Sequence, residues 1–219
     1  MPLKIDLHLH THYSADATTT LKEVVHHAKK RGLDGIAVTD HDTTSGALRL
    51  MKQKHFLVIP GIEISSLQGH VLALNVTQPI PPELSLPETV EKIHQFGGIA
   101  VIAHPTAVLK TGLGHTLISS ASNLDAVEVI NTAAFPFFLT TYLSRRLAQR
   151  LKLPQTAGSD AHHPDEIGNA YTLINADSNR DDVTDAVKKG RTTPFGKPIS
   201  WLLRLHRGAS NIQTKLGGR

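Results

Sequence analysis

Short apolar runs alternate with helical patterns along almost the whole chain, and the two patterns predict different elements. The apolar runs predict strands at Lys4–Leu9, Gly35–Thr39, Phe56–Pro60, Val71–Val76, Ile99–Ala103, Ala126–Ile130, Gln155–Gly158 and Tyr171–Asn175. Apolar residues at helical spacing predict helices around Leu21–Ala28 and at Leu86–Phe96, Phe138–Leu151 and Arg180–Lys189. This alternation is typical of β/α units arranged around a parallel sheet or barrel.

The length and the even patterning of the chain indicate one domain. The chain has 219 residues, of which 40% are hydrophobic, so it is long enough to bury one substantial core. No linker or internal repeat interrupts the alternation. We therefore expect a single barrel domain over residues 1–200 and a basic C-terminal tail over residues 201–219.

Histidines and acidic residues recur at or just beyond the points where predicted strands end. The pattern is seen five times, with His8 and His10, Asp40 and His41, Glu63, His104, and Asp160 and His162. In a parallel β/α barrel the C-terminal ends of the strands converge on one face, where active sites are built. Residues far apart in the sequence are therefore expected to share one pocket. His8 and His10 are two apart in a strand, so both side chains point the same way and reach the same ion.

The composition restricts how such a pocket binds metal. The sequence contains no cysteine, which excludes disulfides, thiolate metal sites and cysteine nucleophiles. It contains 14 histidines, several of them next to Asp or Glu. Imidazole together with carboxylate suits borderline divalent ions, so the sequence predicts a metal site of this chemistry.

The motifs that carry these residues resemble the polymerase and histidinol phosphatase (PHP) domain family. They occur in the family's order, as Asp6-Leu7-His8-Leu9-His10-Thr11, Thr39-Asp40-His41-Asp42-Thr43, Pro60-Gly61-Ile62-Glu63-Ile64, Ala103-His104-Pro105 and Gly158-Ser159-Asp160-Ala161-His162. The resemblance implies an α/β fold, a distorted (β/α)7 TIM-like barrel with its metal site at the C-terminal ends of the strands. It also implies two or three divalent ions, of manganese, zinc, iron or magnesium, and the hydrolysis of phosphoesters.

The resemblance further implies a grouping of the ligands. One ion is held by four residues, His8, His10, Glu63 and Asp160. Glu63 bridges to a second ion, which His104 and His70 also hold, and a third group consists of Asp16, His41 and His162. Catalysis is expected to depend on His8, His10, Glu63, His104, Asp160 and His162.

Two ligand assignments have alternatives. His12 is the rival of Asp16, because the spacing of this ligand varies among relatives. His70 begins a predicted strand, where it is otherwise a partly exposed cross-strand residue. Glu128 either lines the site or has a structural role. Substrate contacts are expected from His163, His115, Lys197 and Arg191.

Three functions are compatible with this sequence, and a small-molecule phosphoesterase acting through a metal-bound hydroxide comes first. Its substrate is a small anionic phosphomonoester or phosphodiester of the nucleotide, sugar phosphate or histidinol phosphate type. The second is a nuclease or nucleic-acid processing factor, because the net charge is +4 and no acid follows Asp185. The third is a non-catalytic metal-binding module, although every ligand position is filled.

The N-terminal sequence and the hydropathy predict a cytoplasmic protein. No run of about 18 apolar residues occurs, so no membrane partner is expected. Charged and imidazole side chains stand from Lys4 to His10, where a signal peptide needs its apolar run. The oligomeric state does not follow from the sequence.

Overall fold

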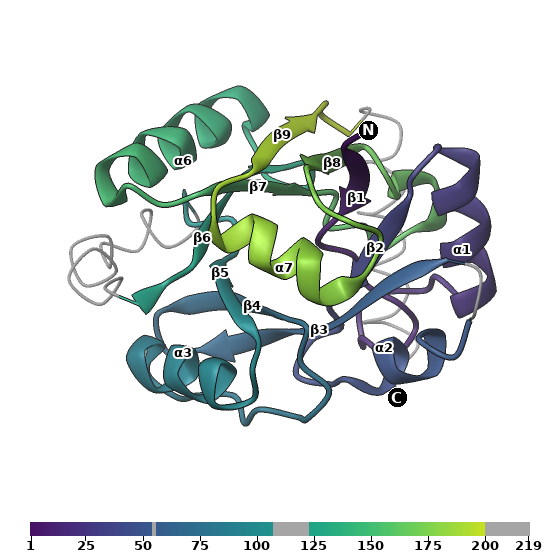
Figure 1. Ribbon diagram of the computed structural model, residues 1–219, viewed down its shortest axis with the longest axis horizontal. Helices are drawn as coiled ribbons and strands as arrows, with labels where there is room; N and C mark the ends of the chain where they lie inside the picture. Colours follow the sequence, from purple (N-terminus) through teal and green to yellow (C-terminus); the bar gives the residue numbers. More distant parts are fainter. Residues whose placement is uncertain (54–55, 107–122, 200–219) are drawn as a thin grey trace, which may run out of the picture.

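The computed structural model describes residues 1–53, 56–106 and 123–199 (Figure 1). Its strands are β1 (Leu3–Asp6), β2 (Gly35–Val38), β3 (Leu57–Ser66), β4 (Gly69–Leu74), β5 (Ile99–Ile102), β6 (Ala126–Asn131), β7 (Gln155–Gly158), β8 (Ala170–Ile174) and β9 (Thr192–Gly196). Its helices are α1 (Leu21–Lys30), α2 (Ser45–Leu50), α3 (Leu86–Gln95), α6 (Phe137–Leu151) and α7 (Arg180–Lys188). The tail expected over residues 201–219 lies outside the described residues.

The strands form one sheet in the order β7-β6-β5-β4-β3-β2-β1-β8-β9, which curls into a nearly closed barrel (Figure 1). The chain beyond β1 and the chain beyond β7 meet at one end, where Asp160 N–H donates to His8 O at 2.7 Å and His10 N–H to Ala161 O at 2.9 Å. At the other end β8 lies against β1, and the hydroxyl of Thr172 bonds to the backbone of Ala157 in β7. Strands β1 to β7 therefore make the predicted distorted (β/α)7 TIM-like barrel.

The directions of the strands differ from the all-parallel expectation. Strands β4, β8 and β9 run antiparallel to their neighbours. Only Leu67 and Gln68 lie between the paired residues Ser66 and Gly69, and so short a connection permits only antiparallel pairing. Strand β3 also continues to Ser66, beyond its predicted end at Pro60, while β9 and α2 were not predicted.

Local sequence signals set the starts of the helices. Thr20 and Glu23 form a capping box at the start of α1, and Ser85 and Glu88 form one at the start of α3. Each cap satisfies backbone N–H groups that the first helical turn leaves unpaired, and losing such a cap costs about 1 kcal/mol. The capped helices pack their apolar faces on the outside of the barrel.

The floor of the barrel is apolar. Inward side chains such as Ile5, Ile59, Leu72 and Val101 form one buried cluster with residues of α7. Figure 1 shows α7 across the opening at this end. The opposite end, where the parallel strands finish, is the end that gathers polar groups. Among the described residues, no helix is both long enough and apolar enough to cross a membrane.

Candidate metal centre

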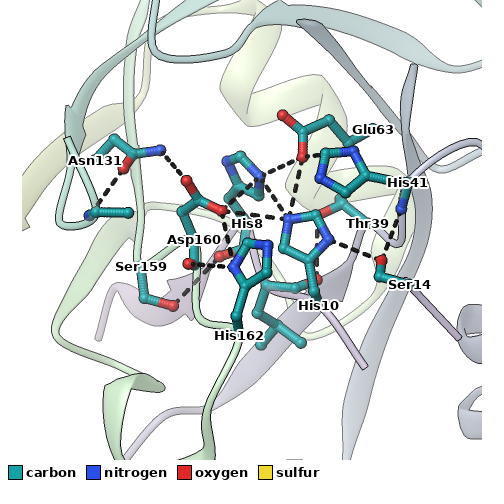
Figure 2. A network of polar contacts seen from close by, with 12 residues as sticks. His8, His10, Ser14, Thr39, His41, Glu63, Asn131, Ser159, Asp160 and His162 are labelled. Carbon is teal, nitrogen blue, oxygen red and sulfur yellow. Dashed lines mark hydrogen bonds and ion pairs between the residues drawn. The ribbon is translucent and has the colours of Figure 1, made fainter. Parts of the chain in front are cut away.

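The polar residues at the C-terminal ends of the parallel strands converge on a single cluster (Figure 2). His8 and His10 follow β1 on alternate positions, and both side chains are fully buried. Glu63 lies within β3 and is 1% exposed. His41 follows β2 and bridges to Glu63 through the backbone, while Asp160 follows β7. Buried charges of this kind are costly unless they are paired or bind an ion.

Four ligand atoms from this cluster surround a common point. Glu63 Oε2 lies 3.0 Å from His8 Nε2 and 3.1 Å from His10 Nε2, and the two nitrogens are 3.2 Å apart. Asp160 Oδ1 lies 3.5 Å and 3.3 Å from the same nitrogens. Tetrahedral ligands about 2.1 Å from an ion lie about 3.4 Å from one another. The spacing and chemistry of the donors therefore fit a divalent ion such as zinc or manganese.

Glu63 faces two sets of imidazoles with its two oxygens. Oε2 faces His8, His10 and also His41, whose Nδ1 is 3.5 Å away. Oε1 lies 2.9 Å from His70 Nδ1 and 3.0 Å from His104 Nε2. A carboxylate placed between two donor sets has the geometry needed to bridge two ions.

Antiparallel pairing explains why His70 is part of this arrangement. His70 stands at the start of β4, whereas Glu63 lies in the second half of β3 and His104 follows the end of β5. Because β4 runs opposite to β3 and β5, its start lies at the edge where those strands end. His70 pairs with Ser65 in the hairpin, and its side chain is 37% exposed.

Asp16, rather than His12, points toward the third group. Asp16 Oδ2 lies 3.2 Å from His162 Nε2 and 3.7 Å from His41 Nε2. Atoms of His10, His41 and His162 also come close enough together to share an ion. His12 instead directs its Nδ1 toward Thr19 O, and its ring lies tilted beside the ring of Tyr13.

Ser14 orients His10, although sequence reasoning did not select it. Its hydroxyl lies 3.1 Å from His10 Nδ1, donates to Asp40 Oδ1 at 3.2 Å and accepts from His41 N–H at 2.9 Å. Since the hydroxyl proton goes to Asp40, the oxygen accepts the His10 Nδ1 proton, which leaves the Nε2 lone pair facing Glu63. A serine in a loop carries no pattern that would have revealed this role.

The charges of the cluster shift several pKa values. Burial lowers the pKa of His10, but hydrogen bonds to Asp160 and Glu63 outweigh it and raise that pKa to about 9. Burial raises the pKa of Glu63, but the charge of His8 and hydrogen bonds from other imidazoles bring it well below its usual range. The hydrogen bond from His162 lowers the pKa of Asp16 to about 2. Without metal, protons on imidazoles thus balance the carboxylates.

The residues expected to contact substrate do not converge on this cluster as the predicted metal ligands do. His163 is half exposed and caps the 3-10 turn Pro164–Glu166. Lys197 follows β9 and is exposed. Arg191 pairs with Asp185 beside α7, at the opposite end of the barrel from the cluster, so the structure does not bring it to the site. His115 lies outside the described residues.

The barrel thus carries, at one end, a buried cluster of imidazoles and carboxylates that could hold divalent metal ions. The chain belongs to the PHP domain family, whose model matches residues 6–128, and a PHP-associated model matches residues 142–192. Proteins of this family are generally metal-dependent hydrolases of phosphoesters.

Two known proteins are similar to this chain in sequence. An uncharacterized protein of Methanocaldococcus jannaschii is 35% identical over 142 residues, which cover 59% of this chain and 82% of that protein. A phosphoribosyl 1,2-cyclic phosphate 1,2-diphosphodiesterase of Eggerthella lenta is 34% identical over 99 residues, 41% of this chain and 37% of that enzyme.

Two solved structures share the fold. A two-domain protein from Bacteroides vulgatus, containing a predicted PHP-like metal-dependent phosphoesterase, has a TM-score of 0.74 at 18% identity. A lesion-specific endonuclease from Pyrococcus furiosus has a TM-score of 0.67 at 17% identity. The matches cover 90% and 89% of this chain but only 65% and 58% of those proteins, so both are considerably longer.

Proposed function

We propose that this protein is a metal-dependent phosphoesterase that hydrolyses a small phosphomonoester or phosphodiester. One observation carries the proposal: the two oxygens of buried Glu63 each face imidazoles at about the spacing of metal ligands, with His8 and His10 on one side and His70 and His104 on the other. Asp160 completes the first set. The assignment of these six residues as ligands of two ions, and of Asp16, His41 and His162 to a third, belongs to the proposal.

The protein's own contribution is to hold and orient the donors. Divalent ions bound here would lower the pKa of coordinated water toward neutrality and offset the charge of the phosphate oxygens. His8 and His10 present their Nε2 atoms from a fully buried position, so the donor geometry is set before substrate arrives. His41 and His162, with exposed fractions of 26% and 18%, line the more accessible side of the cluster with Asp16.

The name of one relative supports a small phosphodiester as the substrate. The Eggerthella lenta relative is named for a cyclic phosphodiester, and it matches this chain over residues that make up only part of each protein. We therefore include cyclic phosphodiesters beside nucleotides, sugar phosphates and histidinol phosphate in the substrate class.

Nucleic acid is the second candidate substrate. The Pyrococcus furiosus neighbour is an endonuclease, and the sequence after Asp185 contains basic residues but no acidic ones. Basic side chains that contact phosphates displace counterions from the nucleic acid, so affinity for an oligonucleotide falls as the salt concentration rises. The rate of oligonucleotide cleavage would fall with it. A small phosphomonoester would show a much flatter salt dependence.

The test begins with metal-free protein reconstituted with manganese or with zinc. We expect two or three bound ions per chain by elemental analysis, and turnover of at least one compound in a panel of phosphomonoesters and phosphodiesters. Glu63→Ala should lose two ions together with activity, because both oxygens are proposed to bind. Glu91→Ala, at an exposed glutamate of α3, is the matched control and should resemble the unaltered protein.

Two results would refute the proposal. One is fewer than one bound ion per chain after reconstitution. The other is full metal occupancy and full activity in Glu63→Ala.

A further inference from the structure

Strand β6 supplies none of the proposed ligands, yet two of its side chains reach the metal centre. Glu128 and Asn131 are three residues apart, and in a regular strand such residues point to opposite faces. Here Glu128 pairs with Thr156 of β7, while Ile130 pairs with the next residue, Ala157. One extra residue in β6 thus forms a bulge, and a bulge re-aims the side chains that follow it. Both Glu128 and Asn131 consequently face the cluster.

Glu128 is a buried carboxylate that accepts from both sides of the centre. Its Oε1 lies 2.9 Å from His8 Nδ1. Its Oε2 accepts from His104 N–H at 2.8 Å and from Asn131 Nδ2 at 3.0 Å. An ionised carboxylate only accepts, so it favours the His8 proton on Nδ1, which would leave the Nε2 lone pair available to an ion bound with Glu63. The backbone of His104, at a φ of 27°, is also held in an uncommon conformation by this bond.

Asn131 extends the same network to Asp160. Its Oδ1 accepts from the N–H groups of Ala133 and Ala134 at 3.0 Å and 3.1 Å, which fixes the orientation of the amide. The Nδ2 group then donates to Asp160 Oδ2 at 3.1 Å as well as to Glu128. Figure 2 shows Asn131 beside Asp160, whose other oxygen faces the imidazoles.

We propose that Glu128 and Asn131 are positioning residues of the metal centre. Glu128 sets the tautomer of His8 and the backbone of His104, and Asn131 sets the direction of the Asp160 carboxylate. They act through ligands and contact no substrate. The proposal deepens the proposed function and rests on it, since it takes His8, His104 and Asp160 as metal ligands.

The packing around Glu128 allows little room for another arrangement. A Cβ atom at Gly158 of β7 would lie 2.8 Å from Glu128 Oε1 and 2.2 Å from His8 Cβ. Both contacts are closer than carbon atoms tolerate, so the missing side chain at Gly158 lets Glu128 reach His8. The bulge and this glycine together create the space that the network occupies.

Glu128→Gln separates the positioning role from simple filling of space. The amide keeps the shape of the carboxylate but replaces one accepting oxygen with a donating NH2. If the NH2 faces His8, it donates to Nδ1 and moves the ring proton to Nε2, where it blocks metal binding. If it faces His104, two donors confront each other. Removal of such a partner typically weakens metal affinity by about 10- to 100-fold.

The first measurement is the affinity for Co2+, with the visible absorption of the bound ion as a second readout. Glu128→Gln and the truncation Asn131→Ala should each bind Co2+ about 10- to 100-fold more weakly, with altered absorption bands. Thr156→Val is the matched control, because Thr156 is buried opposite Glu128 and, within the described part of the chain, its hydroxyl donates only to Val127 O. It should bind Co2+ like the unaltered protein. Unaltered affinity and spectrum in Glu128→Gln and Asn131→Ala would overturn the proposal.

The second measurement works on the metal-free protein. Nitrogen-15 NMR, at a pH high enough for neutral rings, should show a larger fraction of His8 protonated at Nδ1 in the unaltered protein than in Glu128→Gln, because Glu63 accepts from Nε2 in both proteins. The same tautomer populations in both proteins would refute the role of Glu128. This readout separates the two proposals: a protein that binds no Co2+ fails the proposed function, whereas the tautomer test still decides the orientation of His8.

Discussion

The stability of the metal-free protein should fall as the pH rises from about 6.5 to about 9. The pKa of His10 is raised from its ordinary value of 6.5 to about 9, since hydrogen bonds to Asp160 and Glu63 outweigh the effect of burial. Between these two values the folded protein holds a proton that the unfolded chain releases. Stability decreases with pH wherever the folded state binds more protons, so this contribution is complete below 6.5 and lost above 9.

The size of the effect follows from the pKa difference. A difference of about 2.5 corresponds to about 3 kcal/mol for His10 alone, with a maximum slope of about 1.4 kcal/mol per pH unit. The pKa values of His8 and His104 are also raised and add to the loss. Burial lowers the pKa of His41, so His41 titrates below the range from pH 6.5 to pH 9. Burial raises the pKa of Asp6 only to about 6, so Asp6 also titrates below it.

Urea unfolding of chelator-treated protein at pH 6.5 and pH 9 measures this directly. We expect the free energy of unfolding to drop by at least about 3 kcal/mol. Saturating zinc should remove the drop, because the ion replaces the protons. His10→Gln should reduce the drop, whereas His94→Gln, at a histidine paired with Asp125 outside the centre, should retain it. A metal-free protein equally stable or more stable at pH 9 would refute the reasoning.

Three further experiments test the centre. Gly158→Ala places a Cβ 2.2 Å from His8 Cβ and should abolish metal binding. Gly32→Ala is its control, because Gly32 has a φ of +65° and a Cβ there would meet nothing within 4 Å. This variant should lower the free energy of unfolding by about 1 kcal/mol in chemical denaturation and leave the metal content unchanged. His104→Ala removes a proposed ligand, so elemental analysis should show at least one ion fewer and the phosphoesterase rate should fall at least 100-fold; a rate within threefold of the unaltered protein would contradict the assignment. Asp16→Asn should weaken one ion selectively in a metal titration while His12→Gln leaves all sites unchanged, and the reverse outcome would restore His12 as the ligand.

Local patterns were sufficient to predict the barrel and the family. Apolar alternation and helix caps depend on neighbours in sequence. The predicted strands were found with their ends shifted by at most three residues, except that β3 continues to Ser66. The pair His8 and His10 was predictable for the same reason, because alternate residues of a strand share a face. The motifs around Glu63, His104 and Asp160 could be ordered along the chain, so their convergence at one end of a barrel was also predictable.

The tertiary structure decided what depends on strand direction and register. His70 reaches the cluster only because β4 runs antiparallel, which places the start of that strand among the ends of its neighbours. Asn131 faces the centre only because a bulge in β6 adds one residue to the alternation. Arg191 was expected near the substrate, but it follows α7 at the far end of the barrel. Composition and spacing describe a residue's neighbours along the chain, whereas a ligand's position in space depends on backbone pairing between segments far apart in sequence.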